Sequence, residues 1–251
     1  MRIKKLLTAA LISTLPFMGN AVAKSVSNDC VAYTQLDNVC ATVPEFKSYY
    51  KKYKAEVIQK VGKGNWYFNL ADEVQAAKEL MLQKLLLHEA EKNNIEKTKW
   101  FKKYLPEIED AKKEIKNWVK EQVKKGKIPP TQAPLVEKRL IQRAVNGYKV
   151  KAYLDMVLKD AIRVTREDIE NFFSAHKGEY GLSPDPDKPN LKVINKRDLV
   201  EAIREEKKQV AAAQLADYLF KKYKVKVNVE LLKKLDKVVN AGQNFKVKDT
   251  K

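Results

Sequence analysis

The sequence predicts a mainly α-helical fold, and three observations support this prediction. Residues Leu70–Ile95 carry apolar side chains three or four positions apart, and further leucines widen this helical face past half of the circumference. Several later segments repeat the same helical spacing, whereas Val225–Val229 alternates with the period of two that is typical of a strand. Asn93 and Asn94 stand where a left-handed cap would end the central helix. A helix this apolar must be covered on more than one side, so other segments are expected to pack around it.

The segment before the central helix is expected to contain one strand and one helix. β-Forming residues surround the turn-prone pair Asp37-Asn38, and they predict a loose loop that leads into a single strand at residues 39–43. A proline tolerated at a first helical position then opens a helix at residues 44–61, which two glycines end.

Two helices after the central one are expected to form an antiparallel hairpin that projects as an arm. Residues 107–125 show a narrow apolar stripe, which would cover little core, and residues 135–161 return as a long helix. A bend rich in proline at residues 128–134 joins them. Helices with such a short connection are usually antiparallel neighbours.

The C-terminal part is expected to contain two helices on either side of a surface loop, and then a strand and a last short helix. Thr165 and Asp168 resemble a capping box at the start of the first helix. Glycine, serine, aspartate and proline make residues 178–195 a loop. Residues 197–223 then predict a second long amphipathic helix.

The first 23 residues contain the three parts of a secretory signal peptide. Basic residues within positions 1–5 precede an apolar run at 6–18, and small residues at 21–23 match a cleavage site. A membrane anchor is the alternative, but the apolar run is short for a bilayer span. We therefore expect an exported, periplasmic protein that is cleaved after Ala23 and is not stably inserted in a membrane.

The precursor has a formal net charge of +18, and removal of the signal segment, which holds three basic and no acidic residues, leaves +15. Such a charge is compatible with nucleic acid, an anionic membrane surface or acidic partners. Export disfavours nucleic acid, and the basic residues are interspersed with Glu and Asp. The charges therefore favour an ordinary solvated helical surface, and no nucleic-acid binding is expected.

The sequence contains two cysteines, Cys30 and Cys40. In an exported protein two cysteines usually form a structural disulfide, with free thiols as the alternative. Their spacing disfavours a thioredoxin-like redox site. The two histidines, His88 and His176, have no ligand-spaced neighbours, so neither a metal nor another cofactor is expected.

Three segments, in this order, resemble the SurA/PrsA/PpiD group of exported foldases and chaperones. Residues 82–95 read LQKLLLHEAEKNNI and are similar to the group's pattern L-x-x-K-L-L-x-x-E-A-x-x-x-x-I, with the first leucine one residue closer. Residues 164–173 read VTREDIENFF and are similar to V-T-x-E-x-I-x-x-Y-Y. The long helix and strand at residues 197–229 resemble the group's closing elements, and the three segments together span most of the mature chain.

The resemblance implies one discontinuous chaperone domain, residues 24–180 plus 196–251. At the loop 178–195, members of the group usually carry a parvulin-type prolyl isomerase domain, which this chain lacks together with its histidine pair. The protein is therefore not expected to be an enzyme. The resemblance also implies that the C-terminal strand pairs with the N-terminal one in a small two-stranded sheet, and that residues 199–220 pack on the central helix.

The function that the resemblance implies is a periplasmic, ATP-independent holdase that binds unfolded or partly folded exported polypeptides, including outer-membrane protein precursors, through apolar surfaces. The alternative is a dedicated assembly or adaptor protein with one folded partner, which a single contiguous apolar patch would favour. The oligomeric state is not predicted.

A client-binding surface needs exposed apolar side chains that charged residues surround. Aromatic residues and one methionine supply the candidates, and for each of them ordinary core packing is the alternative. Trp118, on the thin arm, is the strongest candidate for exposure. The complete set of candidate peptide-binding residues is Trp66, Tyr67, Phe68, Trp100, Phe101, Tyr104, Trp118 and Met156.

Overall fold

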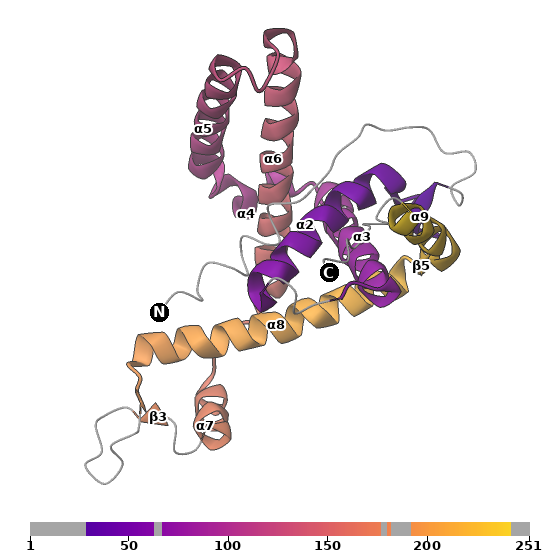
Figure 1. Ribbon diagram of the computed structural model, residues 1–251. Helices are drawn as coiled ribbons and strands as arrows, with labels where there is room; N and C mark the ends of the chain where they lie inside the picture. The colour runs from indigo at the N-terminus through magenta and orange to yellow at the C-terminus, as the bar shows by residue number, and fades with distance from the viewer. Residues whose placement is uncertain (1–28, 63–66, 177–179, 182–191, 242–251) are drawn as a thin grey trace, which may run out of the picture. The chain divides into compact units, whose positions relative to one another are not determined.

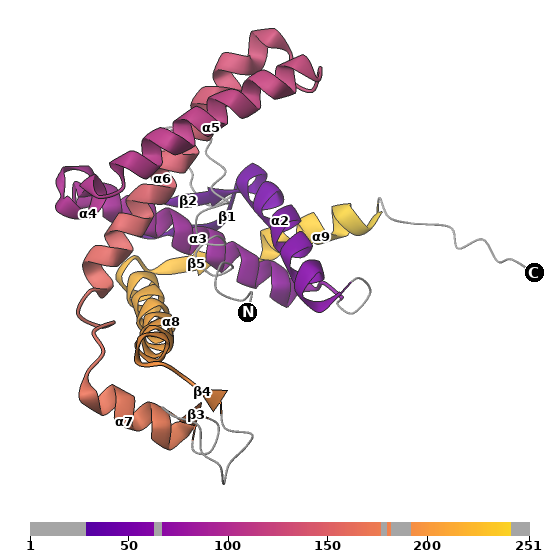
Figure 2. The ribbon, with the colours of Figure 1, turned by 90° about the vertical axis from the view of Figure 1, so that its left-hand side faces the viewer.

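The computed structural model describes residues 29–62, 67–176, 180–181 and 192–241 (Figures 1 and 2). The predicted signal segment, Trp66 and most of the loop 178–195 lie outside the described residues. Within the described part, helices dominate and a small antiparallel sheet accompanies them. The prediction of a mainly α-helical fold is thus confirmed.

The described residues form two compact units, which are described one at a time: those up to Tyr153 together with those from Leu219 onward, and those from Leu154 to Tyr218. The expectation of one discontinuous domain is not tested by this division and stays a prediction. The elements of the first unit are β1 Cys30–Thr34, β2 Cys40–Thr42, α2 Val43–Val61, α3 Leu70–Lys92, η1 Ile95–Lys97, α4 Lys99–Lys102, α5 Leu105–Lys124, η2 Pro130–Gln132, most of α6 Ala133–Leu158, the last turn of α8 Lys196–Lys222, β5 Val225–Val227 and α9 Val229–Ala241.

The sheet of the first unit has three antiparallel strands in the order β2-β1-β5. The predicted pairing between the N- and C-terminal segments is confirmed, but β5 pairs with β1 rather than with residues 39–43. The sheet has three strands rather than two, so the prediction of a single N-terminal strand is wrong. Asp37 and Asn38 adopt φ values of 62° and 50°, in the left-handed region that these two residue types tolerate. Their conformation closes the β1–β2 hairpin, in which the Thr34 amide donates a hydrogen bond to the Val39 carbonyl at 2.9 Å.

The predicted disulfide between Cys30 and Cys40 is confirmed, and their Cα atoms are 5.7 Å apart. Cys40 lies opposite Tyr33, and Cys30 lies opposite Thr42, after a shift in register between Cys30 and Ala32. The disulfide thus runs diagonally across the hairpin. A loop longer than a two-residue turn, together with this irregularity, reconciles a hairpin with a disulfide.

Helices α2 and α3 begin at capping boxes, which explains where the sequence turns helical. Thr42 accepts the third amide of α2 while Glu45 accepts the Thr42 amide at 2.8 Å. Asn69 and Asp72 do the same at the start of α3. Helix α3 ends close to the predicted position, where Asn94 adopts φ 48°.

Helix α3 is the centre of the first unit, since α2, all three strands and α9 pack against it. Its buried residues lie on more than one side, as its broad apolar face predicts. The C-terminal cover consists of Leu219, Tyr223 and Leu232, which are at most 2 % exposed. The expectation that residues 199–220 as a whole provide this cover needs correction, because Leu199 and Ile203 are buried in the core of the second unit.

The predicted hairpin is formed by α5 and α6, which lie side by side in both views (Figures 1 and 2). Gly126, with φ +68°, ends α5, and the turn η2 leads into α6. At the base of the hairpin the ring centroids of Tyr104 and Tyr148 are 5.7 Å apart, and Lys151 Nζ lies 3.4 Å from a Glu107 carboxylate oxygen. A second base contact joins Lys149 Nζ to Glu96 at 2.7 Å.

The second unit contains the end of α6, α7 Arg166–Ala175, β3 Tyr180–Gly181, β4 Lys192–Val193 and α8 up to Tyr218. The capping box of Thr165 and Asp168 is confirmed. The Asp168 carboxylate also accepts from Lys207 Nζ at 2.7 Å. Its pKa falls to about 2, because the Lys207 ammonium and the Thr165 amide and hydroxyl donate hydrogen bonds to it. Phe172 packs in the core of this unit.

Candidate functional site

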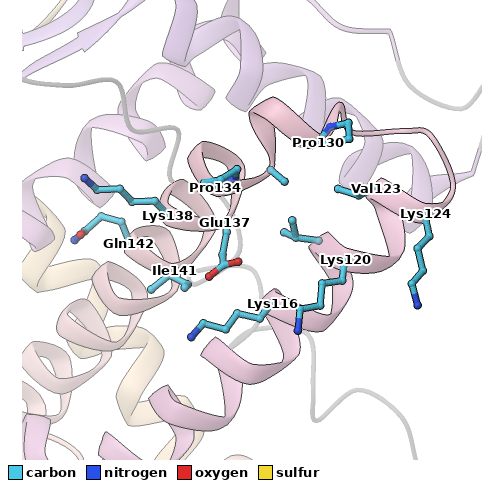
Figure 3. Close-up of a pocket in the computed structure, with 12 residues that line it drawn as sticks. Lys116, Lys120, Val123, Lys124, Pro130, Pro134, Glu137, Lys138, Ile141 and Gln142 are labelled. Atoms are coloured by element: carbon cyan, nitrogen blue, oxygen red, sulfur yellow. The ribbon is translucent and has the colours of Figure 1, made fainter.

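A groove lies between α5 and α6 in the outer part of the hairpin (Figure 3). Its volume is about 740 Å³. Apolar and proline side chains supply much of its lining, and long charged side chains supply most of the rest. The lining residues are Lys116, Val119, Lys120, Val123, Lys124, Pro130, Ala133, Pro134, Glu137, Lys138, Ile141 and Gln142.

The sequence of α5 explains the two-part character of this lining. At about 100° per residue, positions three and four apart share a helix face. Val119 and Val123 therefore stack on successive turns, and Lys116, Lys120 and Lys124 form a row beside them. Val119 is buried and Val123 is half-buried. From α6, Glu137 points toward α5 (Figure 3).

The lysines of the groove differ from other lysines of α5 in their partners. Lys112 and Lys113 on α5, and Lys125 at its C-cap, do not line the groove and form ion pairs with Glu109, Asp110 and Glu121 of this helix. Among the residues that the structure describes, no carboxylate lies within 4.0 Å of the ammonium groups of Lys116, Lys120, Lys124 or Lys138. The groove therefore combines an apolar floor with a row of lysines that form no ion pair with the described chain.

Trp118 is 48 % exposed, in line with its being the strongest candidate for exposure. However, it does not line the groove. Trp118 is two residues from both Lys116 and Lys120, so its side chain leaves α5 about 200° away from theirs. The exposed tryptophan and the groove thus lie on different faces of the same helix.

The other predicted residues are spread over the molecule rather than gathered at one site. Tyr67 is 88 % exposed, and Phe68 is half-buried with its ring edge against Tyr50 at 6.2 Å. Trp100 is half-buried beneath Lys103, whose Nζ lies 5.4 Å from the ring centroid. Met156 is half-buried and belongs to the second unit, and Trp66 lies outside the described residues.

Phe101 and Tyr104 need correction as candidates for an exposed surface. They are 7 % and 6 % exposed, because Phe101 in the short helix α4 and Tyr104 at the N-cap of α5 are packed into the core at the base of the hairpin. In this conformation they offer no accessible apolar area to a peptide.

Sequence reasoning missed the residues of the groove because it searched for aromatic side chains. The signal was present in the proline-rich bend, which predicts two facing helices, and in valines and lysines repeating on α5 at three- and four-residue intervals. The narrow apolar stripe of α5 predicts that this helix covers little core, whereas part of the same helix lines a groove.

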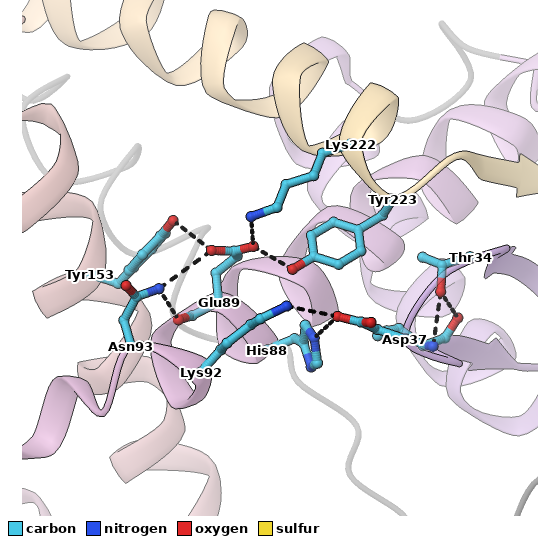
Figure 4. Close-up of polar contacts among 10 residues, drawn as sticks. Thr34, Asp37, His88, Glu89, Lys92, Asn93, Tyr153, Lys222 and Tyr223 are labelled. Atoms are coloured by element: carbon cyan, nitrogen blue, oxygen red, sulfur yellow. Dashed lines mark hydrogen bonds and ion pairs between the residues drawn. The ribbon is translucent and has the colours of Figure 1, made fainter.

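A second polar cluster surrounds Glu89 on α3 (Figure 4). Glu89 is 4 % exposed, and its carboxylate accepts hydrogen bonds from Lys222 Nζ at 2.5 Å, from the Tyr223 hydroxyl and from the Tyr153 hydroxyl at 3.3 Å. The side-chain amide of Asn93 also lies 3.4 Å from it. These donors come from three separate parts of the chain.

The charge of Glu89 is stabilised by these donors. Burial by itself would raise the pKa of the carboxyl, but hydrogen bonds from Lys222 and Tyr223 outweigh it and hold the pKa below 4.5. Burial and the hydrogen bond to Glu89 raise the pKa of the Tyr223 hydroxyl. A carboxylate with so many donors is a poor proton acceptor, so the cluster is suited to joining α3 to the C-terminal segment rather than to acid–base chemistry.

A neighbouring exposed cluster joins the β1–β2 loop to α3. The Asp37 carboxylate lies 3.0 Å from His88 Nε2 and 3.1 Å from Lys92 Nζ, and these two partners lower its pKa (Figure 4). Within the described ranges no group of three His, Cys, Asp or Glu residues could hold a metal ion. Among the helices of the described part, none has the length and apolar content that a bilayer crossing requires.

These features define a mainly helical protein with a disulfide-linked hairpin, a central buried helix and an apolar, lysine-lined groove on a helical arm. Comparisons with models of known families, with curated proteins and with solved structures found no match to the chain. The relation to the SurA/PrsA/PpiD group therefore depends on the sequence resemblance and stays a prediction.

Proposed function

We propose that this protein is a periplasmic, ATP-independent chaperone that holds unfolded exported polypeptides, including outer-membrane protein precursors. The observation that carries the proposal is the groove between α5 and α6. A holdase needs accessible apolar surface within charged surroundings that keep the free protein soluble, and the groove combines the two. The resemblance to exported chaperones and the signal-like N-terminus support the same proposal.

The distribution of exposed apolar side chains favours many clients over one folded partner. Besides the groove, large exposed apolar residues occur on separate elements, among them Leu36 on the β1–β2 loop, Leu135 on α6 and Val210 on α8. A dedicated adaptor would instead concentrate such residues in one contiguous patch. Dispersed contacts suit a surface that adapts to different unfolded chains.

The test is an aggregation assay with the protein purified after export. An outer-membrane protein unfolded in urea is diluted without nucleotide, and light scattering is followed at increasing chaperone concentration. Suppression at stoichiometric amounts is expected, and unchanged aggregation would refute the proposal. Stoichiometric co-purification of one folded partner, without suppression, would favour the adaptor.

A matched pair of variants connects the activity to the groove. Val123→Glu places a charge in the half-buried floor, and it is expected to weaken suppression while leaving the circular dichroism spectrum unchanged. Val210→Glu makes the same change at a site on α8 that is 58 % exposed, and as one of several dispersed apolar residues outside the groove it should weaken suppression much less than Val123→Glu does. If the wild type and both variants suppress aggregation equally, the client-binding surface lies outside the groove.

A further inference from the structure

The spacing of the lysines along the groove bears on which conformation of a client segment the groove can bind. Lys116, Lys120 and Lys124 follow one another every fourth residue, so their Cα atoms advance by about 6 Å per step along α5. In an extended chain, residues that share a face are two apart and advance by about 6.7 Å. Flexible lysine side chains absorb this small difference over two steps, so the row can face three alternate residues of an extended segment.

The lysines of the row form no ion pair within 4.0 Å with the described chain, although the charge of Lys116 helps to lower the pKa of Glu109. Two lysines of α5 outside the groove, and Lys125 at its C-cap, are paired with carboxylates of this helix, whereas those of the row have no such partner among the described residues. Glu137 is the single acidic residue in the lining, against four lysines. The groove is therefore complementary to a partner that supplies carboxylates along with apolar groups.

A peptide segment fits these observations better than an anionic lipid surface. A protein that rests on a membrane places its interfacial tryptophan and its lysines on the same outward face. Here Trp118 leaves α5 about 200° from Lys116 and Lys120, so the two features cannot meet one flat surface together. The apolar residues Val119 and Val123 instead lie within the groove, beside the lysines.

We propose that the groove selects extended segments in which apolar residues alternate with Asp or Glu. The apolar side chains face the floor at Val119, Val123 and Ile141, and the carboxylates on the opposite face of the segment pair with the lysine row. Strands of outer-membrane barrels alternate apolar and polar residues with this period, so their unfolded precursors contain such segments. The inference rests on the proposed function and specifies its substrate class.

Fluorescence anisotropy with labelled nine-residue peptides tests the selection on the full exported protein. One peptide alternates Val and Glu, a second alternates Val and Lys, and a third has the composition of the first with the glutamates in one block. The alternating Val–Glu peptide is expected to bind at least tenfold more tightly than either of the others. Its affinity should fall in about 1 M salt, where charges are screened beyond roughly 3 Å.

Two triple variants with equal changes in net charge separate the groove from the charge of the arm. The variant K116Q/K120Q/K124Q removes the row, and K113Q/K125Q/K127Q removes three lysines that do not line the groove. Each exposed ion pair changes a binding constant by about two- to fivefold, so loss of the row should weaken binding of the Val–Glu peptide roughly tenfold or more. The control variant should bind this peptide like the wild type.

The outcomes distinguish this inference from the proposed function. Equal affinity for all peptides, or equal loss in both triple variants, would overturn the selection even if the protein still suppresses aggregation of an outer-membrane protein. Binding to phosphatidylglycerol vesicles that the row variant abolishes, without peptide binding, would reassign the lysines to a membrane. Failure of the aggregation assay itself would instead refute the proposed function.

Discussion

Replacement of Glu89 by alanine tests whether the C-terminal segment is attached to α3 through a buried carboxylate. The substitution removes the acceptor of Lys222, Tyr223 and Tyr153 at once. The two tyrosines are 2 % and 5 % exposed, so their hydroxyl groups would stay buried without this partner. Lys222 is more accessible, with 35 % of its side chain exposed, and its ammonium can turn to water.

The magnitude follows from these exposures. A buried donor that loses its partner costs about 1–3 kcal/mol. The Tyr223 hydroxyl, with a smaller contribution from the longer Tyr153 hydrogen bond, therefore predicts a loss of roughly 2–3 kcal/mol in the free energy of unfolding at pH 7. Lys222 adds little because its charge regains hydration. Removal of one partner from a fully buried ion pair costs about 3–5 kcal/mol, and this value sets an upper bound on the loss of stability.

Urea unfolding followed by far-UV circular dichroism provides the assay. With a slope of about 2–3 kcal/mol per M, the expected loss lowers the midpoint by roughly 1 M without a change in slope. Lys92→Ala is the matched control, because Lys92 pairs with Asp37 on the exposed side of the same helix, and it should leave the midpoint unchanged. A midpoint for Glu89→Ala equal to that of the control would refute the reasoning.

The same pair of proteins predicts a pH dependence. The pKa of Glu89 in the folded protein lies below 4.5, so folding favours the charged form. The stabilisation is fully present above pH 4.5 and is lost as the pH falls through the folded-state pKa. The difference between wild type and Glu89→Ala should therefore be constant near neutral pH and narrow in acid. A difference that widens as the pH falls would contradict the assignment.

Three further predictions concern the disulfide, the C-terminal segment and Trp118. Joint replacement of Cys30 and Cys40 by serine should lower the free energy of unfolding by about 2–3 kcal/mol, as the closed loop is short, and a reductant should reproduce this loss in the wild type. A chain ending at residue 195 lacks three fully buried side chains worth about 1.5–3 kcal/mol each, a large part of a typical 5–15 kcal/mol stability, and should lack a cooperative unfolding transition. A stably folded 24–195 chain would show that α3 does not need this cover. Trp118→Ala should change neither the urea midpoint nor the affinity for the Val–Glu peptide, and a large loss of affinity would extend the binding surface beyond the groove.

Much of the candidate site could be predicted only in outline. The proline-rich bend and the periodic segments beside it predict the hairpin, and the position of Trp118 on this arm predicts its exposure. The groove itself could not be predicted, because helical periodicity says which residues share a face but not how closely two helices approach each other. The burial of Phe101 and Tyr104 depends in the same way on how the segment that contains α4 and the start of α5 packs at the base of the hairpin.

The sequence by itself determined the local elements of this protein. Capping residues placed the start of α2, α3 and α7, asparagine ended α3, and two cysteines after a signal-like N-terminus predicted their disulfide. These features follow from interactions between residues close in sequence, or from residue counts, which a single sequence contains in full.

Only the tertiary structure decided which distant segments meet. It paired β5 with β1 rather than with β2, gave Leu199 and Ile203 a core of their own, and brought Lys222 and Tyr223 to Glu89. The physical reason is that apolar burial is non-directional: a broad apolar face on α3 requires cover but does not specify which segment supplies it. Hydrogen-bonded strand edges and buried polar groups make that choice, and their partners are remote in the sequence.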